Sequence, residues 1–259
     1  MTPLSDGVGI GPNGERGSGS EPSDPTPYLG VAIPAAGIGR RMGGVDKAFQ
    51  ELAGIPLLQH ALRPFLDVPG VRSVVVALGE EHAAAPPVWM QELDPRIRVV
   101  AGGATRSDSV RLALEALAEH GATIEVAVVH DGARPFVSRE VVQRCVEQVR
   151  PGRGAVAGWP VVDTLKEVDS GRGVVGTPDR TRYWRAQTPQ AFPLMELLKA
   201  YRRAVGEDFE GTDDAAVFQW AGGRVQMVEG TAWNLKVTHP EDLRVARAFV
   251  DAKGAETPP

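Results

Sequence analysis

A glycine-rich stretch near the start of the sequence carries residues that could bind phosphate groups. It spans 34–47, PAAGIGRRMGGVDK, and places Arg40, Arg41 and Lys47 among backbone N–H groups that glycine leaves open to a ligand. Guanidinium and ammonium groups beside such donors suit a triphosphate, whose charge must be neutralised wherever it is held. A flexible turn with solvated arginines is the competing interpretation, and the basic residues favour the nucleotide.

This stretch matches neither of two common phosphate-binding loops. The dinucleotide pattern G-x-G-x-x-G would place its last glycine at Met42, and the P-loop pattern would place its lysine at Val45. The glycines alone are therefore a weak signal, and the prediction of a bound nucleotide depends on the basic residues.

A second candidate for phosphate chemistry is the stretch 130–135, HDGARP, which follows an apolar run and puts Asp131 at the end of a predicted strand. A carboxylate there can hold Mg²⁺ that bridges nucleotide phosphates. An isolated strand-end aspartate is more often a turn or helix cap. The neighbouring Arg134 and the phosphate loop favour the metal site.

A third candidate is the stretch 102–109, GGATRSDS. Its glycines allow close approach to a planar base, and Ser109 offers a hydroxyl to a ribose or a base edge. The structural interpretation is a helix entry capped by Ser107, which is compatible with binding.

Strands and helices that alternate along the chain must position these three stretches. Buried strands are predicted at 28–33, 71–78, 96–101 and 124–130. Helices between them predict an α/β protein with a largely parallel sheet, and ligands gather at the carboxyl ends of such strands. The loops at Gly37, Gly102 and Asp131 should all open at that edge.

In the second half of the sequence, the regular alternation of predicted strands and helices ends. Short β-type runs around the turn 169–173 predict a hairpin arm that projects from the sheet at about 160–183. Further helices are predicted from Pro193, over 213–220 and from Pro240, and closing strands over 224–229 and 233–237.

Composition limits the class of protein. The 259 residues are 42% hydrophobic, enough for a substantial core, and the net charge of −5 argues against nucleic-acid binding. Cys145 is the only cysteine and lies among valines at helical spacing, which predicts a buried structural thiol in a reducing compartment. No apolar run is long enough to span a bilayer. We therefore expect a cytoplasmic protein with no membrane partner.

Domain boundaries follow from the same pattern. Residues 1–27 are rich in Gly, Pro, Ser and Asp and are predicted to form a disordered tail. Residues 28–253 form a single domain that includes the arm, and 254–259 form a frayed tail.

Seven short motifs occur in one order along the chain: P-A-A-G-x-G-R-R-M, G-G-A-x-R-x-x-S-V, H-D-G-A-R-P, D-T-L-K, A-Q-T-P-Q, T-D-D-A and L-K-V-T-x-P-E-D. In this order the sequence resembles the 2-C-methyl-D-erythritol 4-phosphate cytidylyltransferases from about Val31 to Leu243. That family joins CTP to a sugar-alcohol phosphate and releases pyrophosphate in the non-mevalonate isoprenoid pathway. The resemblance implies a nucleotidyltransferase fold, a Rossmann-like and mostly parallel sheet flanked by helices with a projecting β-hairpin arm.

The resemblance also implies roles for particular residues. The catalytic set, which grips the triphosphate and positions the attacking phosphate, is Arg40, Lys47, Arg180 and Lys236. The CTP-binding set is Ala35, Ala36, Gly37, Gly103, Arg106 and Ser109. The residues that contact the sugar-alcohol phosphate are Arg134, Thr164, Thr188 and Thr212. Asp131 would bind Mg²⁺ or another divalent cation. The family is a homodimer whose arms exchange, so Thr164 and Arg180 would serve the partner's site.

Two alternatives remain open at this point. Enzymes that use ribitol 5-phosphate share most of these residues, and a catalytically silent nucleotide-binding protein would keep the fold. Without the resemblance, Arg180 and Lys236 would be interpreted as solvated charges and Thr164 and Thr188 as ordinary strand residues. A silent protein has no chemical need for the full set of cations, which favours the enzyme.

Overall fold

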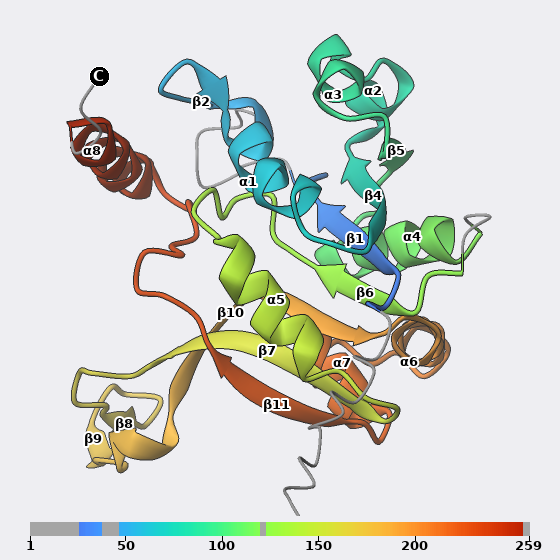
Figure 1. Ribbon diagram of the computed structural model, residues 1–259. Coiled ribbons are helices and arrows are strands. Elements are labelled where there is room, and N and C mark those ends of the chain that lie inside the picture. Colours follow the sequence, from blue (N-terminus) through green and yellow to red (C-terminus); the bar gives the residue numbers. More distant parts are fainter. Residues whose placement is uncertain (1–25, 38–46, 120–122, 256–259) are drawn as a thin grey trace, which may run out of the picture.

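A seven-stranded sheet is the centre of the computed structural model, which describes residues 26–37, 47–119 and 123–255 (Figure 1). Its strands are β1 (Leu29–Pro34), β4 (Val71–Leu78), β5 (Ile97–Ala101), β6 (Val126–Val129), β7 (Arg153–Pro160), β10 (Trp184–Pro193) and β11 (Arg224–Glu229). They lie in the order β11-β7-β10-β6-β1-β4-β5. Every neighbouring pair is parallel except the two made by β10. The predicted mostly parallel α/β sheet is confirmed.

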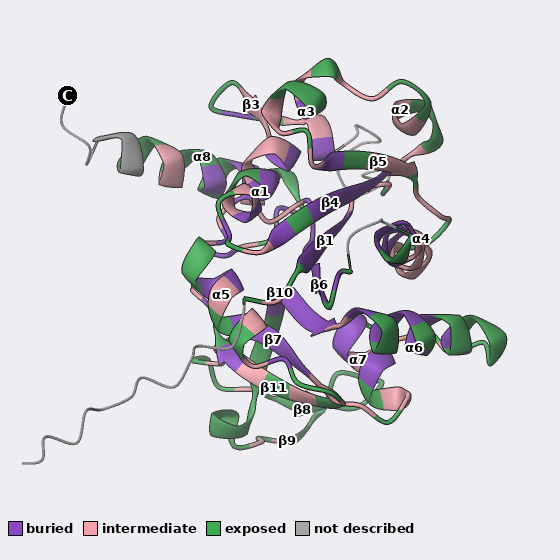
Figure 2. Cartoon of the chain, turned by 45° about the vertical axis from the view of Figure 1, so that its right-hand side comes forward, coloured by how far each residue is buried: buried purple, intermediate pink, exposed green. Residues whose placement is uncertain are grey.

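Helices cover both faces of this sheet, which explains why strands such as β4 are apolar almost throughout. On one face, α1 (Leu57–Leu66) and α5 (Arg139–Glu147) bury Phe65 and Cys145 against the strands. On the other, α4 (Arg106–Ala118), α6 (Leu194–Gly206) and α7 (Asp214–Trp220) bury Leu114, Tyr201 and Phe218. Figure 2 shows the buried strands between these layers. Burial raises the pKa of Cys145 to about 12, so the predicted structural thiol is confirmed.

The remaining helices lie at the margins. Two short ones, α2 (Glu80–Ala84) and α3 (Val88–Leu93), pack beside β5. The last, α8 (Pro240–Ala255), extends away from the sheet (Figure 1) and includes the first two residues of the segment 254–259 that the sequence assigns to a tail. It packs near the small hairpin of β2 (Glu51–Leu52) and β3 (Ile55–Pro56). Of the predicted N-terminal tail, only residues 26 and 27 lie within the described residues.

Helix α4 begins two residues earlier than the predicted cap at Ser107 requires. Thr105 is the N-cap: its side chain accepts a hydrogen bond from the Asp108 N–H, and the Asp108 carboxylate accepts one from the Thr105 N–H. This reciprocal pair satisfies two donors that a helix start leaves free. The prediction of Ser107 was therefore wrong; at α5 the N-cap is Ser138, whose side chain accepts the Val141 N–H.

The predicted strand over 233–237 is also wrong. This segment is irregular, and its Val237 N–H donates to the carbonyl of Ala133 at 2.9 Å. Val237 is buried with Leu52 and Leu243 in a small third cluster between α8 and the β2–β3 hairpin. Apolar residues that pack in this cluster gave the segment its strand-like composition.

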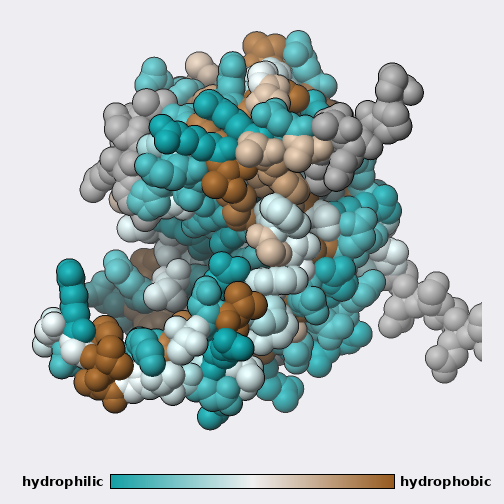
Figure 3. Space-filling model, turned by 90° about the vertical axis from the view of Figure 1, so that its left-hand side faces the viewer, coloured by the Kyte–Doolittle hydropathy of each residue, from teal (hydrophilic) through white to brown (hydrophobic). Residues whose placement is uncertain are grey.

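The arm leaves the sheet where β7 ends and returns where β10 begins. It contains the antiparallel pair β8 (Glu167–Val168) and β9 (Val174–Gly176) and a 3-10 turn, η3 (Arg180–Arg182). Asp169 closes the hairpin turn, because its Oδ1 accepts hydrogen bonds from the N–H groups of Gly171 and Gly173. Figure 3 shows the arm projecting at the lower left with hydrophobic surface on it.

Candidate active site

A pocket of about 490 Å³ opens at the carboxyl edge of the sheet, where the loops after β1, β5 and β6 meet. Eight of the predicted site residues line it: Ala35, Ala36, Gly37, Gly103, Arg106, Ser109, Asp131 and Lys236. Residues from four separate stretches of sequence therefore share one cavity, as the parallel sheet predicts.

Close backbone approach joins the loops after β1 and β5. A Cβ atom on Gly102 would collide with the Cβ of Ala36, so a larger residue would push the two loops apart. The hydroxyl of Ser109 donates to the carbonyl of Thr105 at 2.9 Å and accepts the N–H of Gly103 at 3.2 Å. These contacts fix the wall of the pocket on the side of α4.

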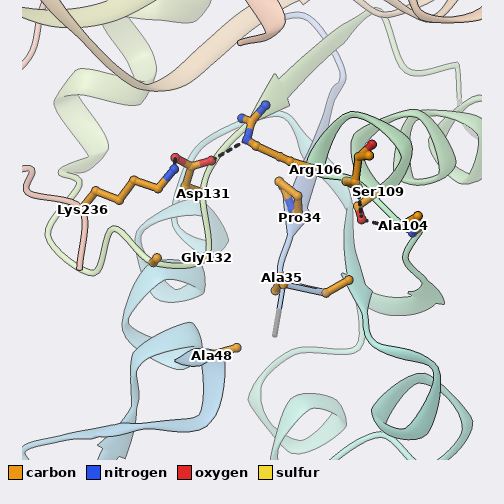
Figure 4. A pocket seen from close by; sticks show the side chains of 14 residues that line it. Pro34, Ala35, Ala48, Ala104, Arg106, Ser109, Asp131, Gly132 and Lys236 are labelled. Atoms are coloured by element: carbon orange, nitrogen blue, oxygen red, sulfur yellow. Dashed lines mark hydrogen bonds and ion pairs between the residues drawn. The ribbon is translucent and has the colours of Figure 1, made fainter. Parts of the chain in front are cut away.

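The carboxylate of Asp131 is the centre of a cluster of cations (Figure 4). Its Oδ1 lies 3.0 Å from Nε of Arg106, and its Oδ2 lies 2.8 Å from Nζ of Lys236 and 3.6 Å from Nε of Arg134. Burial raises the pKa of this carboxyl, but attraction to Arg106 and Lys236 outweighs burial and leaves that pKa well below its usual range. Asp131 is therefore ionised at neutral pH.

Arg106 has a second partner that the sequence analysis did not identify. Its Nη1 and Nη2 donate to the two carboxylate oxygens of Asp214 at 3.0 and 2.8 Å, and the hydroxyl of Tyr201 donates to the same carboxylate. Burial lowers the pKa of Arg106, but Asp214 and Asp131 outweigh burial and raise it above its usual range. The only signal in the sequence was the motif T-D-D-A, in which Asp214 is the second aspartate, two residues after the predicted Thr212.

The backbone at Asp131 is held from behind by two buried side chains. The hydroxyl of Thr188 accepts the Asp131 N–H at 3.1 Å and contacts Nδ1 of His130 at 2.9 Å, and Nε2 of His130 contacts the carbonyl of Arg134 at 3.0 Å. Because a carbonyl only accepts, Nε2 carries the proton and Nδ1 accepts from the hydroxyl. Burial lowers the pKa of His130 to about 4, so this ring is neutral. Thr188, predicted to contact substrate, uses its hydroxyl inside the protein.

Lys236 reaches the pocket from the irregular segment before α8. The Arg134 guanidinium donates to the carbonyl of Asn234 at 2.8 Å, and the Asn234 side-chain amide donates to the carbonyl of Thr188 at 2.7 Å. Together with the bond from Val237 to Ala133, these contacts tie the segment to the loop after β6. Arg134 thus lies behind Asp131 rather than in the pocket wall.

None of the other predicted residues whose side chains the structure describes lines the pocket. Thr164 and Arg180 are exposed on the arm, where Nη1 of Arg180 donates to the carbonyl of Val162 at 2.8 Å. Thr212 is exposed just before the N-cap of α7. Lys47 begins a 3-10 turn, η2 (Lys47–Phe49), whose next residue Ala48 lines the pocket. Arg40 lies outside the described residues.

A divalent cation at Asp131 would have one carboxylate from the protein. Among the described residues no group of three or more His, Cys, Asp or Glu side chains is arranged to hold a metal. Mg²⁺ commonly binds through one or two carboxylates, with phosphates and water completing its shell. The donor set fits a cation that enters with a nucleotide, provided that Lys236 gives up its bond to Oδ2.

The mostly parallel sheet and the cationic cluster at its carboxyl edge define a nucleotidyltransferase-type α/β protein. The sequence profile of the 2-C-methyl-D-erythritol 4-phosphate cytidylyltransferase family matches residues 29–252. A relative with that name from Syntrophotalea carbinolica is 41% identical over 230 residues, 86% of this chain and 97% of the relative. One from Bacillus licheniformis is 38% identical over 226 residues, 86% of this chain and 96% of the relative.

A solved structure gives the same result. The 2-C-methyl-D-erythritol 4-phosphate cytidylyltransferase from Thermus thermophilus is 37% identical and superposes with a TM-score of 0.72, covering 86% of this chain and 99% of that one. The chain belongs to the 2-C-methyl-D-erythritol 4-phosphate cytidylyltransferase family and is an enzyme of the nucleotidyltransferase class. Within the part of the chain that the structure describes, no helix is long and apolar enough to cross a membrane.

Proposed function

We propose that this chain transfers the cytidylyl group of CTP to 2-C-methyl-D-erythritol 4-phosphate, a step of isoprenoid biosynthesis. The products are 4-CDP-2-C-methyl-D-erythritol and pyrophosphate. The single observation that supports this most is the pocket, in which two glycine-containing loops face Asp131 and Lys236. Family membership selects the substrate.

In this reaction an oxygen of the acceptor phosphate attacks the α-phosphorus of CTP, and the bond from that phosphorus to the bridging oxygen of pyrophosphate breaks. The acceptor phosphate is already an anion at neutral pH, so no general base is required. The protein must align two anions and offset their repulsion. A pocket that gathers cations around one carboxylate suits this task.

The cations around Asp131 differ in exposure and in the number of carboxylates that bind them, and this difference supports separate roles for them. The Lys236 side chain is 40% exposed and is held by one carboxylate, so it can turn from Asp131 to the acceptor phosphate. Arg106 is held by two carboxylates and stays in place. Residues 36 and 37 also line the pocket, and their backbone N–H groups are proposed to face CTP.

Mg²⁺ is the proposed metal, with Asp131 as its protein ligand. When bound, it would neutralise charge on the phosphates of CTP. Lys236, released from Asp131, would then be free for the acceptor. Arg40 and Lys47 are proposed to grip the triphosphate from the loop after β1, as the resemblance implies.

The arm supplies support for a homodimer. Thr164 and Arg180 lie on it, outside the pocket of their own chain, and its valines are exposed to solvent. We infer that two chains exchange arms, so that Thr164 and Arg180 contact the acceptor in the partner's site. Thr212 is proposed to contact the acceptor in its own chain. The one free, buried cysteine is compatible with a cytoplasmic enzyme.

The test is a pyrophosphate-release assay with CTP and three acceptors: 2-C-methyl-D-erythritol 4-phosphate, ribitol 5-phosphate and a hexose phosphate. We expect the first to have the highest kcat/KM. A higher kcat/KM for ribitol 5-phosphate would overturn the substrate assignment. Tight CTP binding without pyrophosphate release from any acceptor would indicate a silent nucleotide-binding protein.

A further inference from the structure

Asp214 is a buried carboxylate that does not line the pocket and has no part in the chemistry proposed above. It is 0% exposed, at the first position of α7. Both of its oxygens bind Arg106, and one of them also accepts the hydroxyl of Tyr201 from α6. Two helices behind the pocket thus hold one of the cations that face it.

The geometry of Arg106 limits what it offers to Asp131. A guanidinium is planar and has five N–H donors in a fixed fork. Nη1 and Nη2 both point to Asp214, which leaves Nε for a single bond to Oδ1 of Asp131 at 3.0 Å. Without the negative charge of Asp214, the fork could turn and bind both oxygens of Asp131.

We propose that Asp214 is a positioning residue that keeps the pocket carboxylate available to a divalent cation, because it holds the terminal nitrogens of Arg106 away from Asp131. Tyr201 assists by fixing the orientation of the Asp214 carboxylate. This inference rests on the proposed function, which supplies the cation and CTP. It assigns a role in metal affinity to two side chains that touch neither metal nor nucleotide.

A purely structural ion pair makes a different prediction. A buried Arg–Asp pair can simply hold α4 and α7 together, and its removal then lowers stability without changing the folded site. Asp94 provides a matched control, because it binds Arg96 through two parallel hydrogen bonds of 2.9 and 2.7 Å. That pair lies before β5, at the end of the strand opposite the pocket.

The experiment measures Mn²⁺ binding to the full-length protein with CTP and no acceptor, by electron paramagnetic resonance, so that no turnover occurs. The variants are Asp214→Asn, Asp214→Glu, Tyr201→Phe and the control Asp94→Asn. We expect Asp214→Asn to weaken Mn²⁺ binding about tenfold, which corresponds to about 1.4 kcal/mol. Asp214→Glu should restore most of it, Tyr201→Phe should weaken it about threefold, and Asp94→Asn should lower only the melting temperature.

Kinetics supply a second readout. In Asp214→Asn the Mg²⁺ concentration for half-maximal rate should rise by the same factor, while kcat at saturating Mg²⁺ falls less than the affinity does. Unchanged Mn²⁺ affinity in Asp214→Asn, with a lower melting temperature, would overturn the proposal. If that variant does not fold, Tyr201→Phe decides, since wild-type affinity there would also overturn it. A wild-type protein that binds no CTP would instead refute the proposed function.

Discussion

The pocket and the arm differ in how far contacts within this chain pair the charged side chains and cover the apolar ones. In the pocket, Asp131 is paired with cations from three segments, and Arg106 makes three hydrogen bonds to two carboxylates. On the arm, Val174 and Val175 are 63% and 61% exposed, and the hydrogen bonds are local, such as Lys166 to Thr177. The pocket carboxylates are thus satisfied within the chain, whereas the apolar surface of the arm still gains free energy from being covered.

The largest expected effect is on turnover, and it concerns Lys236, the most exposed of the three described cations that pair with Asp131. Lys236→Met should reduce kcat about 100- to 1000-fold, because it removes the charge that is proposed to act on the attacking acceptor phosphate. Folding stability should change by less than about 1 kcal/mol, since partly exposed ion pairs contribute little. Pyrophosphate release and urea unfolding measure the two quantities. Lys199→Met on α6, an exposed position, is the control, and equal losses in both variants would contradict the role of Lys236.

The second effect concerns the arm. Val175→Asp should raise the dimer dissociation constant by a factor on the order of 100, because a buried, unpaired carboxylate costs several kcal/mol. Sedimentation equilibrium measures the dissociation constant. Val205→Asp on α6 is the control, with 62% exposure at the starting residue. If the wild-type protein stays monomeric at all concentrations, the arm is not a dimer interface and this prediction is wrong.

The third prediction tests the interior support of the pocket. The pKa of His130 is lowered to about 4 by burial, so the folded state binds fewer protons than the unfolded state between pH 6.5 and 4. Stability from this group is full above the unfolded pKa and is lost as pH falls through that window, by about 3 kcal/mol in total. Urea unfolding at pH 7 and pH 5 should show this loss in wild type and a smaller one in His130→Gln. An identical pH dependence would show that another group titrates.

The smallest effect is a labelling rate. Because the pKa of Cys145 is raised to about 12, native protein at pH 8 should react with iodoacetamide far more slowly than protein in urea. Mass spectrometry of the labelled protein measures this. Rapid labelling of the native state would mean that the layer of α5 opens readily, and that the side of the sheet behind the pocket is less rigid than proposed.

Strands and helices with a clear period could be predicted from the sequence. The run 71–78 matches β4 to the residue, because a parallel strand that is covered on both faces is apolar over most of its length. The pattern of valines with Cys145 placed α5 correctly. Loops at the carboxyl ends of such strands then brought all six residues of the predicted CTP-binding set into one pocket.

Most of the features that could not be predicted from the sequence depend on contacts between segments that are distant in the chain. β10 contains Gln187, Pro189 and Gln190, whose types are unusual in a strand, yet it lies between β6 and β7. The cap of α4 could have been found, since Thr105 and Asp108 form the T-x-x-D spacing of a capping box, which Ser107 lacks. The pairing of Asp214 with Arg106 spans 108 positions of sequence, and no local pattern encodes it.

The position of Lys236 depends on a segment with no place in the sheet. Val237, one residue further on, is anchored in the small cluster with Leu243 of α8. A force that draws the last helix outward would therefore act on Lys236 and, through the bond from Val237 to Ala133, on the wall of the pocket. A fused domain, a neighbouring protein or a ligand that pulls on α8 would therefore lower the rate of catalysis without touching the pocket.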